Sequence, residues 1–531
     1  MKKNLLLILT VCCALQLNAQ VNSSVLASGD WFKFSVDTTG VFKIDRNLLQ
    51  RIGVSTNNIN PQNIRIYGNG GALLPFVNND FRYQDLQENA IYVEGESDGS
   101  FDANDFILFY AKGPHDWVLD TVNKSAKHRQ NIYSDKAYYF ITVGNTAGKR
   151  IQNKALNANS AATQISSFDD FIFYEKEEVN LLGAGTQWFF DDNFNIENTQ
   201  SFTIPFDKVL VNEDIFIRTR AVSNSISSST LSVKANNTDL YTLSFSGLNP
   251  SSLTKAVTSE RTAAFTNPTN AITLELNYNN NGNPSANAFL DFIEIYGKKN
   301  LLANGKQFGF RSFNQFDTSG TVEFQIKNAS EIYQVWDVTN AINPELITNE
   351  SFTSDFTFKV NGGVLNEYVV LNSSDFYIPE TIENSRVENQ NLHALKDINY
   401  LVITSKDLVS QAQRLADYHQ TNSGLSTKVV VLDEIYNEFA SGSKDITGIR
   451  DFIRHLYTTN SSEDKKLKFV CFFGDSSYDY KDRIANNNNV VPVKLPSQTD
   501  DIYHFNLAFS YVTDDFFVML DTNDGSMSSS H

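Results

Sequence analysis

Few residues in this sequence could carry out covalent chemistry. Cys12 and Cys13 lie among the first twenty residues, and the third cysteine, Cys471, lies within the apolar run Phe469–Phe473. A cysteine nucleophile needs an exposed thiolate beside a base, whereas a short apolar run predicts a buried strand. We therefore predict that Cys471 is a structural residue, and the sequence identifies no catalytic residue.

The histidines do not form a recognisable metal or catalytic motif. No two stand at metal-ligand spacing, and there is no His-Glu-x-x-His, Gly-x-Ser-x-Gly or phosphate-loop motif. His419 and His455 lie on predicted amphipathic helices, which favours a surface or core-edge role. We expect no cofactor. The seven histidines are His115, His128, His393, His419, His455, His504 and His531.

Two acidic regions raise the question of calcium, which prefers oxygen ligands. The loop Glu94–Asp105 is rich in carboxylates, but it lacks the closing glutamate of an EF-hand, and its Asp-Gly step is an ordinary turn signal. A second group of aspartates lies between Asp475 and Asp524. Solvated turns are the favoured interpretation of both, and a structural calcium ion stays an alternative.

The elements that would position such residues are mostly strands as far as residue 390. Phe32, Phe34 and Val36 alternate with polar residues, and a turn at Gly40 predicts a hairpin with the next strand. The same alternation recurs between asparagine- and serine-rich turns, which indicates antiparallel β sandwiches. The predicted units are an N-terminal β domain at 20–160, a β sandwich at 161–300 and a β-rich connecting region at 301–390.

The pattern changes after residue 390, where continuous apolar runs alternate with helical stripes. This β-α-β-α-β order predicts a parallel sheet with right-handed crossovers. Functional groups in such sheets gather at the carboxyl ends of the strands. We therefore expect Gly474–Ser477, which follows the third strand, to lie at the functional edge. The three strands are predicted at 400–404, 428–432 and 469–473.

The N-terminus predicts export. Lys2 and Lys3 precede the mostly apolar run Leu5–Leu15, and a small residue precedes the predicted cleavage site at Gln20. This pattern is typical of a secretory signal peptide, here residues 1–19, which is too short to span a membrane. No later run is long enough, so we expect no transmembrane helix after the signal peptide.

Length and charge narrow the function further. The 531 residues suggest three or four domains. The 61 acidic and 43 basic residues give a net charge of −18, which disfavours nucleic-acid binding, because phosphate recognition needs a basic surface. With one cysteine beyond residue 20 there is no internal disulfide, so stability must come from the core.

Six motifs occur in this order along the chain: Gly29–Phe34, Gly40–Ile44, Asp105–Ala111, Phe472–Asp475, Pro496–Tyr503 and Tyr511–Val518. Together they resemble the gingipain-type cysteine peptidases of family C25. The resemblance implies antiparallel β-sandwich domains followed by an incomplete α/β, caspase-like peptidase domain with a parallel sheet. The order of the motifs is most similar to the sortases of the type IX secretion system, which implies an exported protein at the cell surface or outer membrane. Implied partners are the C-terminal sorting signals of cargo proteins and other secretion-system components.

The sequence departs from this family at the catalytic residues. The family's Gly-His-Gly type loop and its later cysteine do not occur, Cys471 corresponds to a core strand, and His531 is the chain end. We expect the chain to be the N-terminal portion of a longer protein, with residues 391–531 as the start of a truncated peptidase domain that is inactive alone. Two alternatives remain: a non-catalytic secretion or surface-binding component, and a carbohydrate-binding adhesin.

Overall fold

The structure is a computed structural model that describes residues 21–57, 59–210, 212–266, 271–493, 505 and 512–525. The predicted signal peptide, His504, His531 and the motif Pro496–Tyr503 lie outside the described residues. Within the described part, no helix is both long and apolar enough to span a bilayer. The fold class is as predicted: mostly antiparallel sheets up to residue 390 and a parallel sheet after it.

Two facing sheets form the N-terminal β domain, with short helix α1 (Arg46–Arg51) beside them. Phe34 and Phe42 from the two sheets both pack on Phe109, with ring centroids 5.7 and 5.9 Å away. One sheet has the order β26 (Glu380–Val387), β1 (Trp31–Val36), β9 (Ala137–Val143), β3 (Ile64–Tyr67) and β4 (Glu88–Asn89). The other has the order β2 (Gly40–Asp45), β6 (Phe106–Ala111) and β5 (Ile91–Glu94).

The predicted hairpin at Gly40 is wrong. β1 pairs with β9 and β26, whereas β2 pairs with β6. The chain turns a corner at Gly40 and enters the facing sheet, so that alternate apolar residues of both strands enter one core. Alternation places one face of each strand in the core, but it does not specify which strand is the neighbour.

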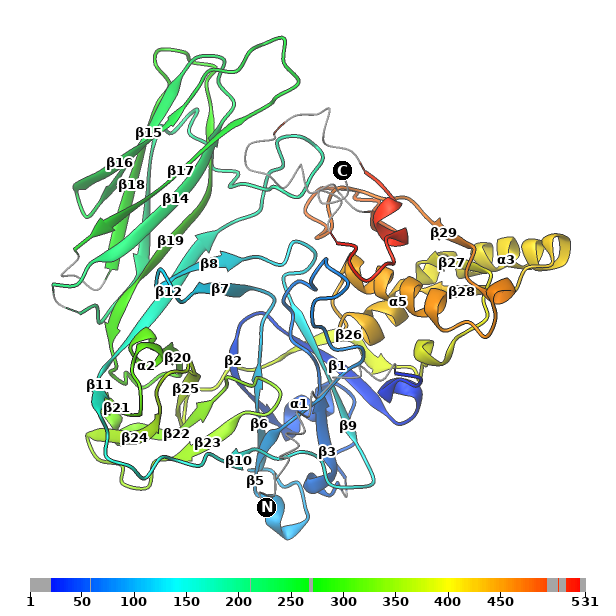
Figure 1. The fold of residues 1–531 in the computed structure, drawn as a ribbon, viewed down its shortest axis with the longest axis horizontal. Coiled ribbons are helices and arrows are strands. Elements are labelled where there is room, and N and C mark those ends of the chain that lie inside the picture. The colour runs from blue at the N-terminus through cyan, green and yellow to red at the C-terminus, as the bar shows by residue number, and fades with distance from the viewer. Residues whose placement is uncertain are drawn as a thin grey trace, which may run out of the picture.

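One nine-stranded sheet runs through both the 161–300 and the 301–390 regions (Figure 1). Its order is β10 (Gln152–Asn153), β23 (Glu345–Thr348), β22 (Ile332–Asp337), β25 (Glu367–Asn372), β20 (Phe308–Arg311), β12 (Ser167–Glu175), β19 (Ala288–Asn300), β14 (Ile215–Ser223) and β17 (Val257–Phe265). Smaller elements beside it are β13 (Thr199–Pro205), β18 (Ala271–Asn279), β15 (Ser229–Ala235) and β16 (Thr238–Phe245), the trio β11 (Thr163–Ile165), β21 (Thr321–Lys327) and β24 (Asp355–Asn361), helix α2 (Phe313–Asp317), and the hairpin β7 (Asp116–Asp120) and β8 (Ser125–Arg129).

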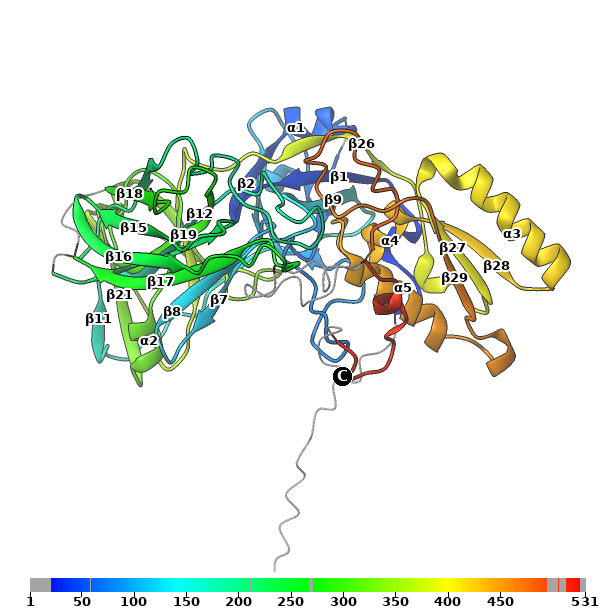
Figure 2. The ribbon, with the colours of Figure 1, turned by 90° about the horizontal axis from the view of Figure 1, so that it is seen from above.

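The residues after 390 form a parallel sheet with the order β28 (Thr427–Val431), β27 (Tyr400–Thr404) and β29 (Phe469–Phe473). Helix α3 (Val409–Ser423) covers one face, and α4 (Leu432–Phe439) and α5 (Ile446–Thr458) pack on the other. Helix α4 is not apparent in the sequence, because Leu432 continues the apolar run of β28. Figure 2 shows α3 on the outside and α4 and α5 turned toward the N-terminal strands.

The α/β unit docks on the N-terminal β domain through buried polar contacts of α4, α5 and the turn between them. The Lys33 ammonium donates to Asn437 Oδ1 at 3.1 Å and to the Gly442 carbonyl at 2.8 Å. Burial lowers the pKa of this lysine to about 8. Arg82 lies 3.0 Å from Asp451 on α5. The helices therefore lie between their own sheet and the N-terminal domain, and both faces of the sheet are covered.

Candidate functional site

The carboxyl ends of the parallel strands open into a small pocket. β27 and β29 run parallel in register, with Thr404 opposite Phe473, so Gly474–Ser477 emerges at this edge as the sequence predicts. The pocket has a volume of about 150 Å³. Residues that follow β27 and β28, residues at the start of α5 and residues of the segment after β29 line it, and we call it the edge pocket. Its lining includes Tyr133, Ser405, Lys406, Leu432, Asp433, Tyr436, Lys444, Asp445, Tyr480, Asn489 and Pro492.

The charges of the edge pocket come mainly from the start of α4 and α5. Burial raises the pKa of Asp445 to about 6. Its carboxylate accepts hydrogen bonds from the backbone N–H groups of Leu74 and Thr447 at 3.0 and 2.8 Å, which lower the pKa but do not outweigh burial. Burial, with the charge of Asp433, raises the pKa of Tyr436 and keeps its hydroxyl neutral. Lys406 and Lys444 also line the pocket, so it carries charges of both signs, and no thiol is among the described residues that line it.

The segment after β29, residues 474–493, is braced internally; we call it the edge loop. Gly474 has φ +149°, and a Cβ there would lie 2.5 Å from Cγ1 of Val490. The Asp475 carbonyl accepts hydrogen bonds from the N–H groups of Val490 and Val491, both at 2.9 Å. The buried carboxylate of Asp479 accepts from the Ile484 N–H at 2.7 Å. These contacts fix the shape of the loop beside the edge pocket.

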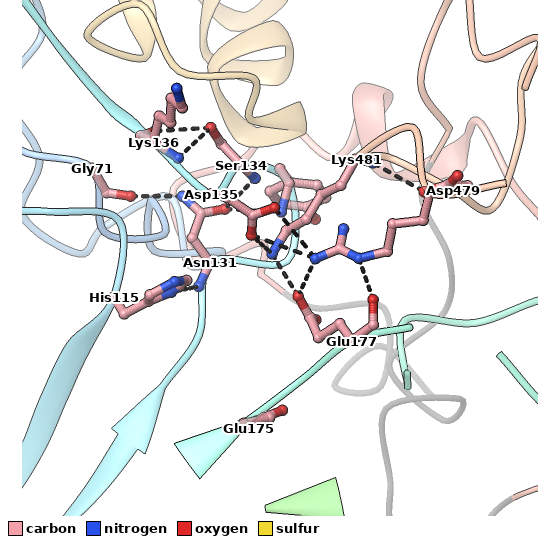
Figure 3. Close-up of polar contacts among 12 residues, drawn as sticks. Gly71, His115, Asn131, Ser134, Asp135, Lys136, Glu175, Glu177, Asp479 and Lys481 are labelled. Carbon is pink, nitrogen blue, oxygen red and sulfur yellow. Dashed lines mark hydrogen bonds and ion pairs between the residues drawn. The ribbon is translucent and has the colours of Figure 1, made fainter. Parts of the chain in front are cut away.

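Four charged side chains tie the edge loop to the N-terminal domain and to the segment after β12, and we call them the clasp: Asp135, Glu177, Lys481 and Arg483. Figure 3 shows Asp135, Glu177 and Lys481 together. The Lys481 ammonium lies 2.7 Å from Asp135 and 2.6 Å from Glu177. Arg483 lies 2.8 Å from Glu177 and 3.3 Å from Asp135. The side chains of Lys481 and Glu177 are only 3% and 6% exposed. Such charges are tolerated in the interior only when they are paired.

Aromatic contacts extend the clasp. Tyr480 of the edge loop packs edge-on against Tyr133, with centroids 4.9 Å apart. Tyr478 stacks on Trp188, with ring centroids 5.9 Å apart, and Trp188 lies in the segment that follows β12. The second β region and the N-terminal domain therefore both help to position the edge loop. No local sequence pattern indicates this arrangement, because its partners lie about three hundred positions apart in the chain.

Cys471 lies in the middle of β29, away from the edge pocket. It is half-buried rather than buried as predicted, because β29 is at the edge of the three described strands. Its thiol faces α3 and contacts the Tyr400 hydroxyl; burial and this contact raise the pKa of Tyr400. The ring of His419 packs in a tilted arrangement against the same tyrosine, with ring centroids 4.5 Å apart. No hydrogen bond joins Cys471 to a histidine among the described residues.

The other described histidines serve the fold. His393 contacts Glu438 at 2.6 Å and the Gln84 carbonyl at 2.9 Å, which links α4 to the N-terminal domain. His455 is buried, and burial lowers its pKa to about 4. His128 lies between Glu175 and Glu294. Burial disfavours its charged form, but the hydrogen bonds that the charged ring donates to the two glutamates outweigh this and raise the pKa of His128 to about 9.

The acidic loop Glu94–Asp105 is a set of turns. Asp105 accepts a hydrogen bond from the Asp102 N–H at 2.6 Å, and Glu96 pairs with Arg150 at 2.8 Å. In the described ranges, no three His, Cys, Asp or Glu side chains are grouped so as to hold a metal ion.

Comparison with known proteins confirms the resemblance. The model of peptidase family C25 matches residues 393–529, so the α/β segment has the sequence pattern of this peptidase family. The crystal structure of dimeric latent PorU from Porphyromonas gingivalis matches with a TM-score of 0.79 and 22% identity. The match covers 95% of this chain and 47% of that chain, so this chain has the PorU fold and spans about half of PorU's length.

Another solved structure matches only weakly. The CBM36-1 domain of a xylanase from the hindgut metagenome of Trinervitermes trinervoides matches with a TM-score of 0.16 and 16% identity. That match covers 24% of this chain and 95% of that domain, and so low a score carries no argument. No curated protein matches the chain.

Proposed function

We propose that this chain forms the framework of an exported C25-type cysteine peptidase, which processes the C-terminal sorting signals of type IX secretion cargo at the cell surface. The observation that carries the proposal is the edge pocket. It lies at the carboxyl edge of a parallel sheet in a segment that matches family C25, within a chain that has the PorU fold.

In this proposal the edge pocket receives part of the substrate chain. Backbone and side-chain groups after β27 and β28 orient the peptide, and the clasp fixes the wall formed by the edge loop. Cys471 is not the nucleophile, because it lies at mid-strand under α3, whereas the chemistry of such sheets takes place beyond the strand ends. The thiolate and its imidazole base are supplied by residues other than those described.

The test is cleavage of a peptide that carries a cargo sorting signal, using the protein purified from its own cells. We expect cleavage that iodoacetamide abolishes and that a Cys471→Ser variant retains. Cleavage that resists iodoacetamide would contradict a cysteine peptidase. Loss of cleavage in a folded Cys471→Ser protein would show that Cys471 itself is the nucleophile.

The alternative of a non-catalytic secretion component makes a different prediction. Cells that lack the gene would then secrete cargo with the sorting signal removed as usual, although less cargo would reach the surface. Under our proposal, those cells accumulate cargo that keeps the signal, which mass spectrometry of the cargo C-termini detects.

A further inference from the structure

The β sandwich carries four loops at one of its ends. The strand register places them together, because Thr199 of β13 lies opposite Asn277 near the end of β18, and Ser223 at the end of β14 lies opposite the starts of β17 and β19. In the same way, β15 starts where β16 ends. This end of the sandwich lies away from β20 and β25 in Figure 1. We call it the sandwich tip, and it consists of residues 191–198, 224–228, 246–254 and 280–287.

Polar contacts join the four loops into one surface. The side-chain amide of Asn195 in the first loop donates to the Ala286 carbonyl of the fourth loop at 3.1 Å. Asn283 of the fourth loop donates from its side chain to Oγ of Ser227 in the second loop at 3.2 Å. A backbone hydrogen bond of 2.9 Å joins the second loop to the third. The tip is therefore a braced surface rather than four independent loops.

This surface presents aliphatic side chains to solvent. Ile196 is 92% exposed, Ile226 is 63% exposed, and the third loop adds Leu253 at 52%. Asn195 and Ser227, the chain neighbours of the two isoleucines, both bind the fourth loop, so both isoleucines lie beside that loop. Single exposed apolar side chains are ordinary, but several that are gathered on a braced surface indicate a contact site.

The sandwich tip contains no basic residue. Its second, third and fourth loops contain no charged residue of either sign, whereas charged residues make up 20% of the chain. The first loop adds only acidic residues, and of these only Asp192 lies near a cation in the described part of the chain, 4.0 Å from Lys176. Nucleic acids and anionic lipids are bound through basic residues. The charge of the tip therefore fits an electrically neutral partner.

The composition of the tip favours a lipid over a protein. Hot spots of protein interfaces are rich in tryptophan, tyrosine and arginine. The tip has none of these, and its only aromatic residue, Phe194, is buried. A lipid needs no matching pocket, but backbone groups that enter it must already be hydrogen-bonded. Asparagine side chains provide this in the fourth loop, where Oδ1 of Asn279, Asn280 and Asn283 each accepts from the N–H two residues further on, at 2.9 to 3.0 Å.

We propose that the sandwich tip binds the surface of a membrane of electrically neutral phospholipids by inserting Ile196 and Ile226. Aliphatic side chains gain free energy on leaving water, in proportion to the apolar area that is buried. The acidic first loop and the lack of basic residues disfavour an anionic lipid surface. The contact needs no catalytic group, so it does not depend on the proposed peptidase function.

The test is cosedimentation of the protein from its own cells with vesicles of phosphatidylcholine. The test variant combines Ile196→Asn with Ile226→Asn. The control is Ile378→Asn, the same change at a residue that is 68% exposed and precedes β26, outside the tip. We expect the unmodified protein and the control to bind equally, and the double variant to bind at least about tenfold more weakly, because burial of one isoleucine is worth about this factor. All three sites are exposed, so the fold should be retained, and thermal melts check this.

A second measurement locates the contact. Bromine atoms on lipid chains quench tryptophan fluorescence only at short range. In vesicles of brominated phosphatidylcholine, the tryptophan added by Ile226→Trp should be quenched, whereas the one added by Ile378→Trp should not.

Four outcomes would overturn the proposal. The first is an unmodified protein that does not sediment with phosphatidylcholine vesicles, and the second is equal binding by the folded double variant. The third is binding that requires phosphatidylglycerol and is lost at high salt, which would indicate electrostatic adsorption. The fourth is equal quenching at the two tryptophan sites. Capture on a glycan array that depends on Ile226, without binding to vesicles, would assign the tip to a glycan instead.

Discussion

Glu177→Gln tests whether the clasp holds the edge loop in place. Glu177 accepts hydrogen bonds from Lys481 at 2.6 Å and Arg483 at 2.8 Å, and its side chain is 6% exposed. The substitution keeps the shape of the side chain but leaves Lys481, 3% exposed, with only the half-exposed Asp135 as its counter-charge. Removing one member of a buried ion pair costs about 3–5 kcal/mol.

Lys481 keeps its contact with Asp135, and the amide oxygen of the new glutamine can still accept a hydrogen bond, so the cost is smaller. We expect the free energy needed to open the edge loop to fall by about 2 kcal/mol. At about 1.4 kcal/mol per tenfold, hydrogen exchange in residues 475–493 becomes roughly thirtyfold faster. Exchange in β27 stays unchanged, because that strand does not touch the clasp. Mass spectrometry of the deuterated peptides measures both regions in one experiment.

A neighbouring glutamate provides the control. Glu178 is exposed and lies 3.6 Å from Lys176, a surface pair of little energetic weight. Glu178→Gln should leave exchange in the edge loop within about twofold of the unmodified protein. In the double variant Glu177→Gln, Lys481→Met, the change in exchange should be smaller than the sum of the changes in the two single variants, because both substitutions remove the same ion pair. Equal exchange in Glu177→Gln and Glu178→Gln would refute the role of the clasp.

Three further predictions concern stability. Because its pKa is raised to about 9, charged His128 stabilises the fold fully below pH 6.5 and loses this contribution as the pH rises to about 9; thermal melts of His128→Gln should lack that decline. Because burial raises the pKa of Asp445 to about 6, the folded state binds this proton more tightly, and the free energy of unfolding should fall as the pH rises from about 4 to 6; Asp445→Asn, which still caps α5, should abolish the fall. Gly474→Ala combines a positive φ with a 2.5 Å clash, so it should lower the melting temperature more than Gly363→Ala, whose φ is +79° and whose Cβ meets nothing.

The sequence predicted the fold class well because side-chain periodicity depends on local burial. Alternating runs became antiparallel strands, and the continuous runs after residue 390 became parallel strands covered on both faces. Strand partners were less predictable, as the false hairpin at Gly40 shows, because alternation carries no information about the neighbouring strand.

The candidate site was predicted only in its location. The alternation of strands and helices predicts a parallel sheet, and Gly474 directly follows its third strand. Its position at the carboxyl edge can therefore be predicted without any side-chain contact. The clasp depends on contacts between Lys481 and residues about three hundred positions earlier, which no local pattern reports. The partial exposure of Cys471 depends on its strand being at an edge, and an apolar run cannot distinguish an edge strand from a central one.

The most direct test of the central claim is a crystal structure of the protein from its own cells, bound to a sorting-signal peptide that carries a thiol-reactive chloromethyl ketone. We predict that the peptide lies in the edge pocket, in contact with residues that follow β27 and β28, and that its thioether bond joins a cysteine other than Cys471. A thioether to Cys471, or a peptide bound away from the edge pocket, would contradict the account.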